Sequence, residues 1–347
     1  MKKFNVGIVG YGWAAGAHIA AVNEGKLGQV TKICSSRKLD AAELSARHGC
    51  ELETYTSLEA MLAEPDLHVL DVCSYHEQHP AQIMAAAKAG KHIIAEKPLT
   101  LSLADLRAIE GAVRTAGVNF CVCFEIRFSS QFLETKALID QGKLGRLHYG
   151  EMDYYHGIGP WYREYEWVRT NTACGSSLLA AGCHALDALL MCMGRDVEEV
   201  ICYGTNSANG TFATYEYPTS TITVLKFRDG KVGKCASVID CFQPYYFHTH
   251  LVGSEGSLLD NKLQSNLQPG SERNRWTPLP FKLVDSGDVA DHPYQTQFDA
   301  FFEAIARGQA MPLTGLAEGV RTHEVIFAAE RSLKEGRPVK MEKVRAR

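Results

Sequence analysis

The first third of the chain alternates short apolar runs with helix-forming segments. The apolar runs predict strands at residues 5–9, 30–34, 67–73, 92–95 and 119–124. The segments between them predict helices at residues 14–23, 41–48, 57–63, 80–89 and 102–116. Ser102 and Asp105 are typical of the N-cap and first turn of the last helix. This spacing predicts a doubly wound parallel sheet with right-handed crossovers.

After Phe124 the apolar positions alternate with polar ones. A helix is predicted at about residues 131–141, followed by strands at residues 150–155, 199–203, 210–217, 220–228, 233–241, 247–252 and 257–259. Asp229-Gly230 and Ser254-Glu255-Gly256 are typical of hairpin turns, so we predict an open, mainly antiparallel sheet. Helices at about residues 294–306 and 316–335 end the pattern. The fold class is therefore α/β plus α+β, with domains at residues 1–124 and 125–347; in one alternative the terminal helices pack back on the first domain.

A glycine pair follows the first predicted strand directly, in the sequence Val6-Gly7-Ile8-Val9-Gly10-Tyr11-Gly12-Trp13-Ala14-Ala15. Gly10 allows a sharp turn, Gly12 has no side chain to hold a pyrophosphate away, and Ala15 lets the helix approach the strand. The helix N-terminus, with its backbone amides and dipole, favours phosphate. The pattern predicts a Rossmann dinucleotide site at residues Gly10 to Ala14.

The end of the second predicted strand bears on which dinucleotide is bound. An acidic residue usually stands there and binds the adenosine ribose, whereas this chain has Ser35, Ser36 and Arg37. Hydroxyls and a guanidinium fork suit a phosphate on the ribose 2′ position. We therefore predict that NADP is favoured, with NAD as the alternative. A solvated turn is the other interpretation of these residues.

Composition limits the partners. The net charge of −4 gives no basic field for nucleic acid or an anionic membrane. The longest apolar stretch, residues 178–193, contains His184 and Asp187 and predicts a buried helix. The 11 cysteines are scattered and include no Cys-x-x-Cys pair, so no disulfide framework and no metal site is predicted. The cytoplasm is the expected location.

Several segments together resemble one family. Ser74-Tyr75-His76-Glu77-Gln78-His79 follows the third strand, and Ala89-Gly90-Lys91-His92-Ile93-Ile94-Ala95-Glu96-Lys97-Pro98 follows the next helix. Gly175–Asp187, Leu251–Ser257 and Gly336–Val339 come later. With the glycine turn, these segments resemble the Gfo/Idh/MocA family of nicotinamide-dependent oxidoreductases over nearly the whole chain. The resemblance implies further cofactor-binding residues, which are Ser74, Tyr75, His76, His79, Glu96 and Lys97.

The resemblance also implies Lys97 and His184 as catalytic residues. In such enzymes the lysine of Glu-Lys-Pro touches both the cofactor and the reacting hydroxyl, where an ammonium stabilises a developing alkoxide. Glu96 either orients the amide end of the cofactor or fixes the loop. His184 suits a proton relay because histidine titrates near neutrality. Asp187, three residues on, orients that ring, contacts substrate or is purely structural.

The chain departs from the family pattern near these residues. Ala180 stands where many members have an aspartate one helical turn before the histidine, the glycine run is Cys174-Gly175-Ser176, and Tyr75-His76 replaces Pro-Asn. Candidates for the role of the missing carboxylate are Glu125, Tyr155 and His156. The aromatic and cationic segment that suits a sugar ring contains Trp161, Tyr162, Arg163, Trp167 and Arg169. Arg127, in a segment that resembles the family's Arg-Phe segment, is a further candidate substrate contact. Packing on the sheet or on a partner subunit is the alternative for the tryptophan segment, and a structural role at the domain junction for Arg127.

We therefore predict an enzyme: an NAD(P)-dependent oxidoreductase that transfers a hydride between nicotinamide and a hydroxyl-bearing carbon of a sugar, glycoside or cyclitol. Lys97 polarises the substrate oxygen and His184 relays its proton. One alternative is a glycoside-cleaving or lyase-type reaction in which bound nicotinamide is reduced only transiently. A non-enzymatic sensor that binds the cofactor is the other. The resemblance implies that the second domain binds substrate and forms a homodimer or homotetramer.

Overall fold

The computed structural model describes residues 3–344, which form two compact units. The first unit runs to Glu125 and takes up the chain again from Asp288 to Val320. The second unit comprises Ile126–Gly287 and the chain from Arg321 onward. The sequence predicted a domain boundary after residue 124, with packing of the terminal helices on the first domain as an alternative. In the structure, residues 288–320 are the part of the C-terminal region that belongs to the first unit.

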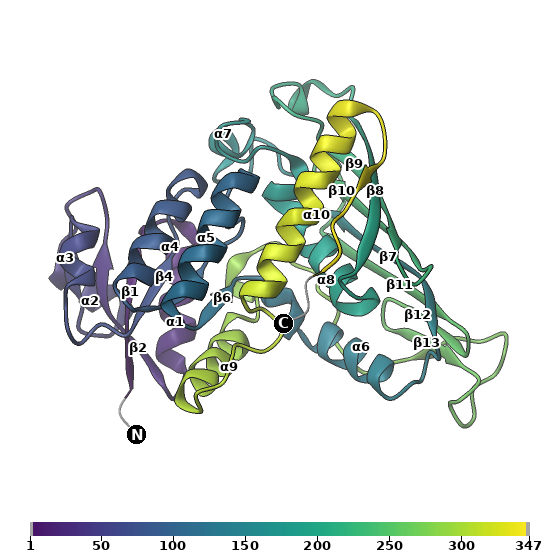
Figure 1. The fold of residues 1–347 in the computed structure, drawn as a ribbon, viewed down its shortest axis with the longest axis horizontal. Helices are drawn as coiled ribbons and strands as arrows, with labels where there is room; N and C mark the ends of the chain where they lie inside the picture. The colour runs from purple at the N-terminus through teal and green to yellow at the C-terminus, as the bar shows by residue number, and fades with distance from the viewer. Residues whose placement is uncertain (1–2, 345–347) are drawn as a thin grey trace. The chain divides into compact units, whose positions relative to one another are not determined.

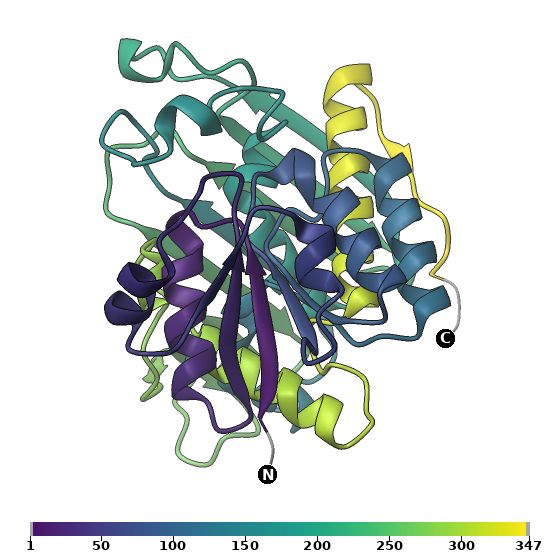
Figure 2. The ribbon, with the colours of Figure 1, turned by 90° about the vertical axis from the view of Figure 1, so that its left-hand side faces the viewer.

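The first unit is built on a six-stranded sheet whose described pairings are all parallel. In spatial order the strands are β3 (Glu53–Tyr55), β2 (Gly28–Cys34), β1 (Phe4–Val9), β4 (Val69–Val72), β5 (His92–Ala95) and β6 (Phe120–Val122). The strand order reverses between β1 and β4, and open α/β sheets bind ligands at the carboxyl ends of such a pair. The predicted doubly wound sheet is confirmed; Figure 2 shows it with β1 in purple.

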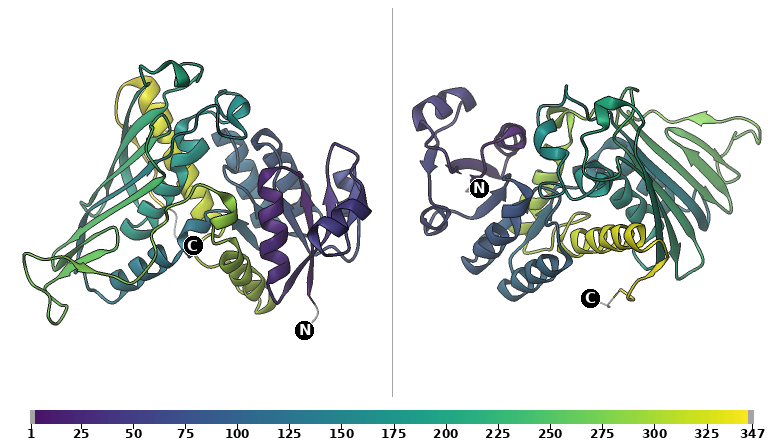
Figure 3. Two further views of the ribbon diagram at one scale, coloured as in Figure 1. Left: turned by 180° about the vertical axis from the view of Figure 1, so that it is seen from behind. Right: turned by 90° about the horizontal axis from the view of Figure 1, so that it is seen from above.

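Helices cover both faces of this sheet. They are α1 (Trp13–Glu24), α2 (Ala41–His48), α3 (Leu58–Leu62), α4 (His79–Lys88), α5 (Leu103–Ala116) and α9 (Tyr294–Ala306). The right-hand view of Figure 3 shows α1 on one side of the sheet, and α4 and α5 on the other. Because both faces are covered, side chains of central strands such as Ile8, Leu70 and Ile93 are fully buried, which explains the continuous apolar runs.

The helix α9 belongs to the first unit through specific contacts. The Gln297 amide donates to the Val122 carbonyl at 2.9 Å and to the Thr314 hydroxyl at 2.9 Å. Gly28 at the start of β2 leaves room for the Phe302 ring, which a Cβ at that position would meet at 2.5 Å. Neutral hydrogen bonds and ring packing therefore fasten the returning segment to the sheet.

The second unit is built on a nine-stranded sheet in which β7 and β10 pair in parallel and the other described pairings are antiparallel. In spatial order the strands are β14 (Thr277–Pro278), β13 (Lys262–Ser265), β12 (Gly256–Leu259), β11 (Tyr246–Gly253), β7 (Leu147–Tyr155), β10 (Val232–Val238), β9 (Ser220–Phe227), β8 (Val197–Thr205) and β15 (Val339–Lys340). The predicted open, mainly antiparallel sheet is confirmed.

Four further helices complete the chain. They are α6 (Ser130–Asp140), α7 (Tyr165–Val168), α8 (Cys183–Met193) and α10 (Leu316–Glu335), of which α10 passes from the first unit into the second at Arg321. Figure 1 shows α6 and α8 against one face of the nine-stranded sheet, and α8 packs on β7 and β10. Between residues 3 and 344 the structure has no helix long and apolar enough to cross a membrane.

Residues 210–217 are not the strand that their alternating pattern predicted. Gly210–Phe212 form a 3₁₀ turn, and the residues after it have no strand pairing. The aromatic side chains are buried by ring packing instead: Tyr215 stacks edge-on against Tyr217, and its hydroxyl donates to the Ile158 carbonyl at 2.9 Å. The alternation therefore comes from aromatic rings that are buried while the loop carrying them is partly exposed. The buried hydroxyls are satisfied by main-chain groups, as the Tyr215 bond shows.

Candidate active site

The glycine turn joins β1 to α1 as the sequence predicted. Gly10 has φ +92° and donates its N–H to the Cys34 carbonyl at 2.9 Å, and a Cβ at Gly10 would lie 2.6 Å from the Ser74 Cα. Gly12 is the N-cap of α1, has φ −112°, and faces open space where a Cβ would project. The first turn of α1 carries no acidic residue. Gly10 is thus required by the fold, whereas Gly12 leaves an uncovered backbone beside a helix N-terminus, which suits a pyrophosphate.

The end of β2 brings a cation to this turn. The Arg37 guanidinium donates to the Tyr11 carbonyl at 2.7 Å, and the Arg37 N–H donates to the Ser35 hydroxyl at 3.2 Å. Ser35 is buried, whereas Ser36 and Arg37 are exposed. The Tyr11 hydroxyl lies 2.7 Å from a ring nitrogen of His48 on α2. An exposed guanidinium and an exposed hydroxyl therefore lie at the place where dinucleotide sites bind the adenosine ribose.

The segment after β4 contains residues with different roles. Tyr75 is half exposed, and the Ser74 hydroxyl donates to the Gln82 side chain at 2.6 Å. His76 is buried, and its ring lies 5.6 Å from that of His79 between centroids. His79 is fully buried, with ring nitrogens 2.8 Å from the Pro98 carbonyl and 3.0 Å from the Ser74 carbonyl. The ring of His79 is enclosed between two backbone segments, which supports a positioning role, and its cofactor contact stays a prediction.

Glu96 fixes the loop that carries Lys97. Its Oε2 accepts the Lys97 N–H at 3.0 Å, and its Oε1 accepts the Tyr294 hydroxyl at 2.8 Å. The same Oε1 lies 3.0 Å from Nε2 of His18. Pro98 follows with a cis peptide bond. Of the two roles that the sequence allowed for Glu96, these bonds support the fixing of the loop.

The residue that sequence analysis missed here is His18. Its ring is fully buried on α1, with Nδ1 2.9 Å from Asp71 on β4 and Nε2 3.0 Å from Glu96. Burial alone would lower the pKa of His18, but the neighbouring Asp71 carboxylate raises it well above its ordinary value. Burial opposes ionisation of Glu96, yet His18 and Lys97 hold its pKa below the ordinary range. His18 is therefore an imidazolium that links two carboxylates.

His184 lies in the second unit among aromatic side chains. A π-helical turn, Leu178–Gly182, precedes α8, and such turns are frequent at functional sites. His184 is 4% exposed, and its ring lies 6.4 Å from that of Tyr154 at an interplanar angle of 22°. The Tyr154 hydroxyl lies 3.2 Å from Nδ1 of His156, whose ring contacts those of Tyr162 and Tyr245. Sequence analysis singled out His156 and Tyr162 but missed Tyr154 and Tyr245, which only the fold brings to this cluster.

Tyr155 was predicted as a substrate contact, and the register of β7 contradicts this. Tyr154 and Tyr155 point to opposite faces of the sheet because successive strand residues alternate. Tyr155 stacks on Tyr246, at 6.0 Å between centroids, and so lies on the face opposite His184.

Arg127 and Asp187 were also predicted as substrate contacts, and the structure pairs them with each other. The Arg127 guanidinium donates to both carboxylate oxygens of Asp187, at 2.5 Å and 2.7 Å, and the Thr322 hydroxyl donates to the same carboxylate at 2.7 Å. The exposed fractions are 4% for Arg127 and 1% for Asp187. This bidentate pair joins the start of the second unit to α8, so both residues have the structural role that the sequence left open.

The segment before His184 is partly exposed. Trp161 is 59% exposed, donates its indole N–H to the Gly157 carbonyl at 2.9 Å, and packs against Phe242. Trp167 lies half-buried on α7. Arg169 is ion-paired with Glu166 at 2.7 Å, on the same short helix. Trp161 thus remains available to a ligand, whereas the Arg169 guanidinium has a carboxylate partner.

Glu125 is the last residue of the first segment of the first unit and is buried. Its Oε1 lies 2.8 Å from Nδ1 of His292, a residue that sequence analysis did not single out.

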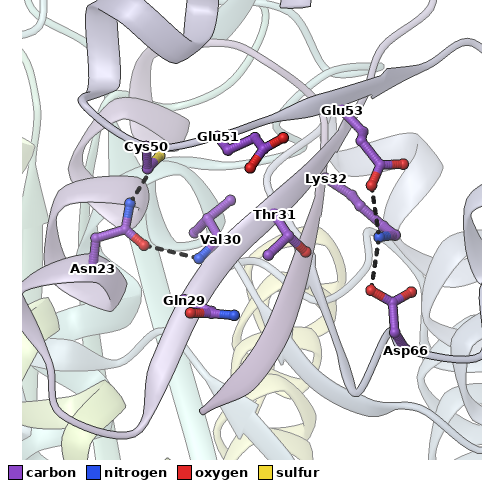
Figure 4. A pocket seen from close by; sticks show the side chains of 9 residues that line it. All are labelled: Asn23, Gln29, Val30, Thr31, Lys32, Cys50, Glu51, Glu53 and Asp66. Atoms are coloured by element: carbon purple, nitrogen blue, oxygen red, sulfur yellow. Dashed lines mark hydrogen bonds and ion pairs between the residues drawn. The ribbon is translucent and has the colours of Figure 1, made fainter.

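A polar hollow of about 350 Å³ opens on the opposite half of β2 from the glycine turn. Figure 4 shows its lining, in which the Lys32 ammonium lies between Glu53 at 3.3 Å and Asp66 at 3.1 Å. The Gly10 end of β1 pairs with the Cys34 end of β2, whereas the hollow begins at Gln29. Because ligands of open α/β sheets bind at the carboxyl ends of the strands, we assign no part of the dinucleotide site to it.

The glycine turn, the reversal of strand order and the Lys97 loop define a dinucleotide-binding Rossmann oxidoreductase. A family model described as an oxidoreductase family with an NAD-binding Rossmann fold matches residues 4–124. The model of the GFO/IDH/MocA C-terminal domain matches residues 132–259. The chain therefore belongs to the GFO/IDH/MocA oxidoreductase family, as its motifs indicated.

Relatives and solved structures align along nearly the full chain. The uncharacterised oxidoreductase YrbE of Bacillus subtilis is 27% identical, with 98% of this chain and 97% of that protein covered. The myo-inositol 2-dehydrogenase of Thermotoga maritima is 24% identical, with 98% and 99% covered. A levoglucosan dehydrogenase in complex with NADH and levoglucosan superposes with a TM-score of 0.83 at 22% identity, covering 99% of this chain and 100% of that one.

The two glycines of the turn are expected to respond differently to alanine. Gly12→Ala adds a Cβ in open space at an allowed φ, so the free energy of unfolding should change by less than about 0.5 kcal/mol while dinucleotide affinity falls about tenfold or more. Gly10→Ala places a Cβ against the Ser74 backbone at positive φ and should cost about 1–3 kcal/mol of stability. Urea unfolding and titration with NAD(P)H fluorescence measure the two effects. Unchanged affinity in Gly12→Ala would contradict the pyrophosphate assignment.

Asp71→Asn is expected to destabilise the first unit by about 3–5 kcal/mol, because it leaves a buried imidazolium with only one of its two carboxylate partners. The raised pKa of His18 contributes stability that is fully present below about pH 6.5, the unfolded value, and is lost as the pH rises through the folded value. The difference in the free energy of unfolding between wild type and Asp71→Asn should therefore become smaller in alkaline solution. Urea unfolding across this range tests the point, and a difference that is independent of pH would show that His18 is neutral in the fold.

Proposed function

We propose that this protein catalyses hydride transfer between a nicotinamide dinucleotide and a hydroxyl-bearing carbon of a sugar, glycoside or cyclitol. The observation that carries the proposal is the Lys97 loop, which Glu96 and His79 hold from both sides at the carboxyl end of β5. Relatives of this chain include dehydrogenases named for myo-inositol, levoglucosan and scyllo-inositol, and a reductase named for 1,5-anhydro-D-fructose. Cyclic polyols are thus the substrate class to test first.

The residues of this chain fit the cofactor that the family implies. Gly12 offers an open backbone to the pyrophosphate, Gly10 and Trp13 frame the turn, and the N-terminus of α1 favours its charge. When bound, nicotinamide would accept or donate the hydride at its C4 atom. Lys97 holds the substrate oxygen and stabilises negative charge that develops on it as the C–H bond breaks. His184, in the second unit, stays a candidate for relaying the hydroxyl proton.

We further propose that NADP is preferred over NAD. The support is the absence of a carboxylate among Ser35, Ser36 and Arg37 at the end of β2, and the Arg37 guanidinium held against the glycine turn. The first unit then supplies the nucleotide site, and the second unit supplies the aromatic substrate site around His184. Assembly as a homodimer or homotetramer and a cytoplasmic location stay predictions of the sequence.

The function is tested by mixing purified protein with a panel of cyclic polyols and glycosides while nicotinamide absorbance is followed with both cofactors. Net reduction of free cofactor is the expected result. Glycoside cleavage without net reduction would instead support the lyase-type alternative, and cofactor binding without any turnover would support a sensor.

Lys97→Ala is expected to lower kcat by about 10²–10³-fold, the usual cost of removing a group that stabilises an oxyanion. Cofactor binding, followed by quenching of tryptophan emission, should persist because the glycine turn is untouched. Lys88→Ala, which removes an exposed lysine at the end of α4, is the matched control and should keep full turnover. Undiminished kcat in Lys97→Ala would exclude the role proposed for this residue.

Arg37→Ala is expected to weaken NADP binding by about tenfold or more and NAD binding far less, because a charge-assisted contact with the 2′-phosphate is lost. Arg37→Lys keeps the charge but not the guanidinium fork, so its affinity for NADP should lie between those of the wild type and Arg37→Ala. Dissociation constants for both cofactors give the comparison. Equal losses for NADP and NAD would remove the proposed 2′-phosphate contact.

A further inference from the structure

The first unit contains a second buried carboxylate–imidazole pair, which no motif of the sequence indicated. Glu125 follows β6, and His292 follows the 3₁₀ turn Val289–Asp291 just after the chain returns to the unit. Nδ1 of His292 lies 2.8 Å from Oε1 of Glu125. The side chains are 1% and 12% exposed for Glu125 and His292. Two chain segments far apart in sequence therefore meet through titratable groups.

The charges around His292 include Lys97. Burial lowers the pKa of His292, but Glu125 at hydrogen-bond distance raises it above its ordinary value; the Lys97 ammonium opposes this rise and Glu96 adds to it. The Tyr294 ring lies 6.0 Å from the His292 ring between centroids. On the preceding 3₁₀ turn, Asp291 is exposed. Tyr294 also donates to Glu96 at 2.8 Å, and Glu96 accepts the Lys97 N–H at 3.0 Å, so His292 lies in the cluster that holds the Lys97 loop.

The chain re-enters the first unit at Asp288, but the need to attach this segment does not explain the Glu125–His292 pair. Gln297 and Tyr294 already bind that segment to the sheet and to Glu96 through neutral donors. A buried ion pair is costly to desolvate, and apolar side chains of similar size would hold the segments as well. A titratable pair beside Lys97 instead offers a group that changes its charge in the range in which alcohol oxidation releases a proton.

We propose that Glu125 and His292 form a proton-relay pair for Lys97, an inference that rests on the proposed function and deepens it. In oxidation, the substrate O–H bond breaks and its proton passes to Lys97 rather than to His184, while the ammonium gives a proton to neutral His292. The C–H bond breaks, both its electrons leave with the hydride that bound nicotinamide would accept at C4, and a C=O bond forms. His292 then releases its proton to water. In reduction the imidazolium supplies the proton, and Glu125 sets the pH at which the exchange occurs.

The pH profile of kcat/KM for polyol oxidation tests the relay. The wild type should lose activity below the pKa of His292, because the imidazole is then already protonated. Glu125→Gln should move this acid limb to lower pH by about one unit or more, and Glu125→Asp should largely restore it. His292→Gln should abolish the limb and lower turnover. An acid limb that stays in place in Glu125→Gln, or that disappears only in His184→Asn, would overturn the proposal.

A matched control comes from the second unit, where His248 lies 3.6 Å from Asp260 and its pKa is also raised by that carboxylate. Asp260→Asn removes a carboxylate from an imidazole in the same way, outside the first unit. It should leave the acid limb unchanged, so a shift there would mean that the limb reports general destabilisation and would overturn the assignment.

A titration by NMR separates this inference from the proposed function, because it needs no activity. The His292 imidazole signal is identified by its loss in His292→Gln. Its pKa should fall in Glu125→Gln, which removes the stabilising charge, and rise in Lys97→Met, which removes the opposing one. If no polyol is oxidised but both shifts occur, the proposed function fails and the coupling of the pair to Lys97 stands. An unchanged pKa in Lys97→Met would overturn the relay even in an active enzyme.

Discussion

The buried imidazolium of His18 is the interaction on which the first unit depends. It joins Asp71 on β4 to Glu96 at the end of β5, and it does so from α1, the helix that follows the glycine turn. The helix and both strands are thereby fixed to one another at the reversal of strand order. Glu96 in turn holds the Lys97 N–H, and His79 holds the Pro98 carbonyl from the other side. The position of the lysine backbone therefore depends on the buried charge of His18, which contacts the residue immediately before it.

Opposite charges alternate along this part of the first unit. Asp71, His18, Glu96 and Lys97 form a series in which each charged group has an oppositely charged neighbour, and the Glu125–His292 pair lies beside the last member. Such a series is stable only as a whole, because removal of one member leaves its neighbours buried and uncompensated. Glu96 has the His18 imidazole as a partner at 3.0 Å, and Glu125 has that of His292 at 2.8 Å.

The sequence was sufficient where structure is decided locally. The helices α9 and α10 have the predicted bounds, and α5 begins as predicted because the Ser102 hydroxyl accepts the Asp105 N–H. Short strands such as β3 and β14, of 3 and 2 residues, gave no periodicity to detect. In residues 210–217 the alternation of aromatic residues was real, but their rings pack in a loop.

The sequence motifs of the candidate site could be predicted, but the pairing of its buried charged groups could not. Asp71 lies inside a run interpreted as an apolar strand, and its partner His18 is 53 residues away, so neither signal alone indicated a buried pair. A polar residue at the centre of such a strand was nevertheless the available clue, because a buried carboxylate requires a partner. Arg127 and Asp187 were recognised as charged residues of the right segments, yet each satisfies the other. Sequence identifies the charged groups, and only the fold decides which of them are paired.

The residues around His184 restrict where a proton can go. Burial raises the pKa of Tyr154 well above its ordinary value, and the neighbouring Tyr245 and Tyr162 raise it further. This hydroxyl therefore stays protonated at neutral pH, 3.2 Å from Nδ1 of His156, and is not suited to act as a base. Ala180 supplies no carboxylate either. With a donor-rich second unit, proton acceptance falls to imidazole groups and to the lysine. The relay proposed for Glu125 and His292 would place one such imidazole in the first unit, where it would set the pH dependence of the rate of oxidation and of reduction.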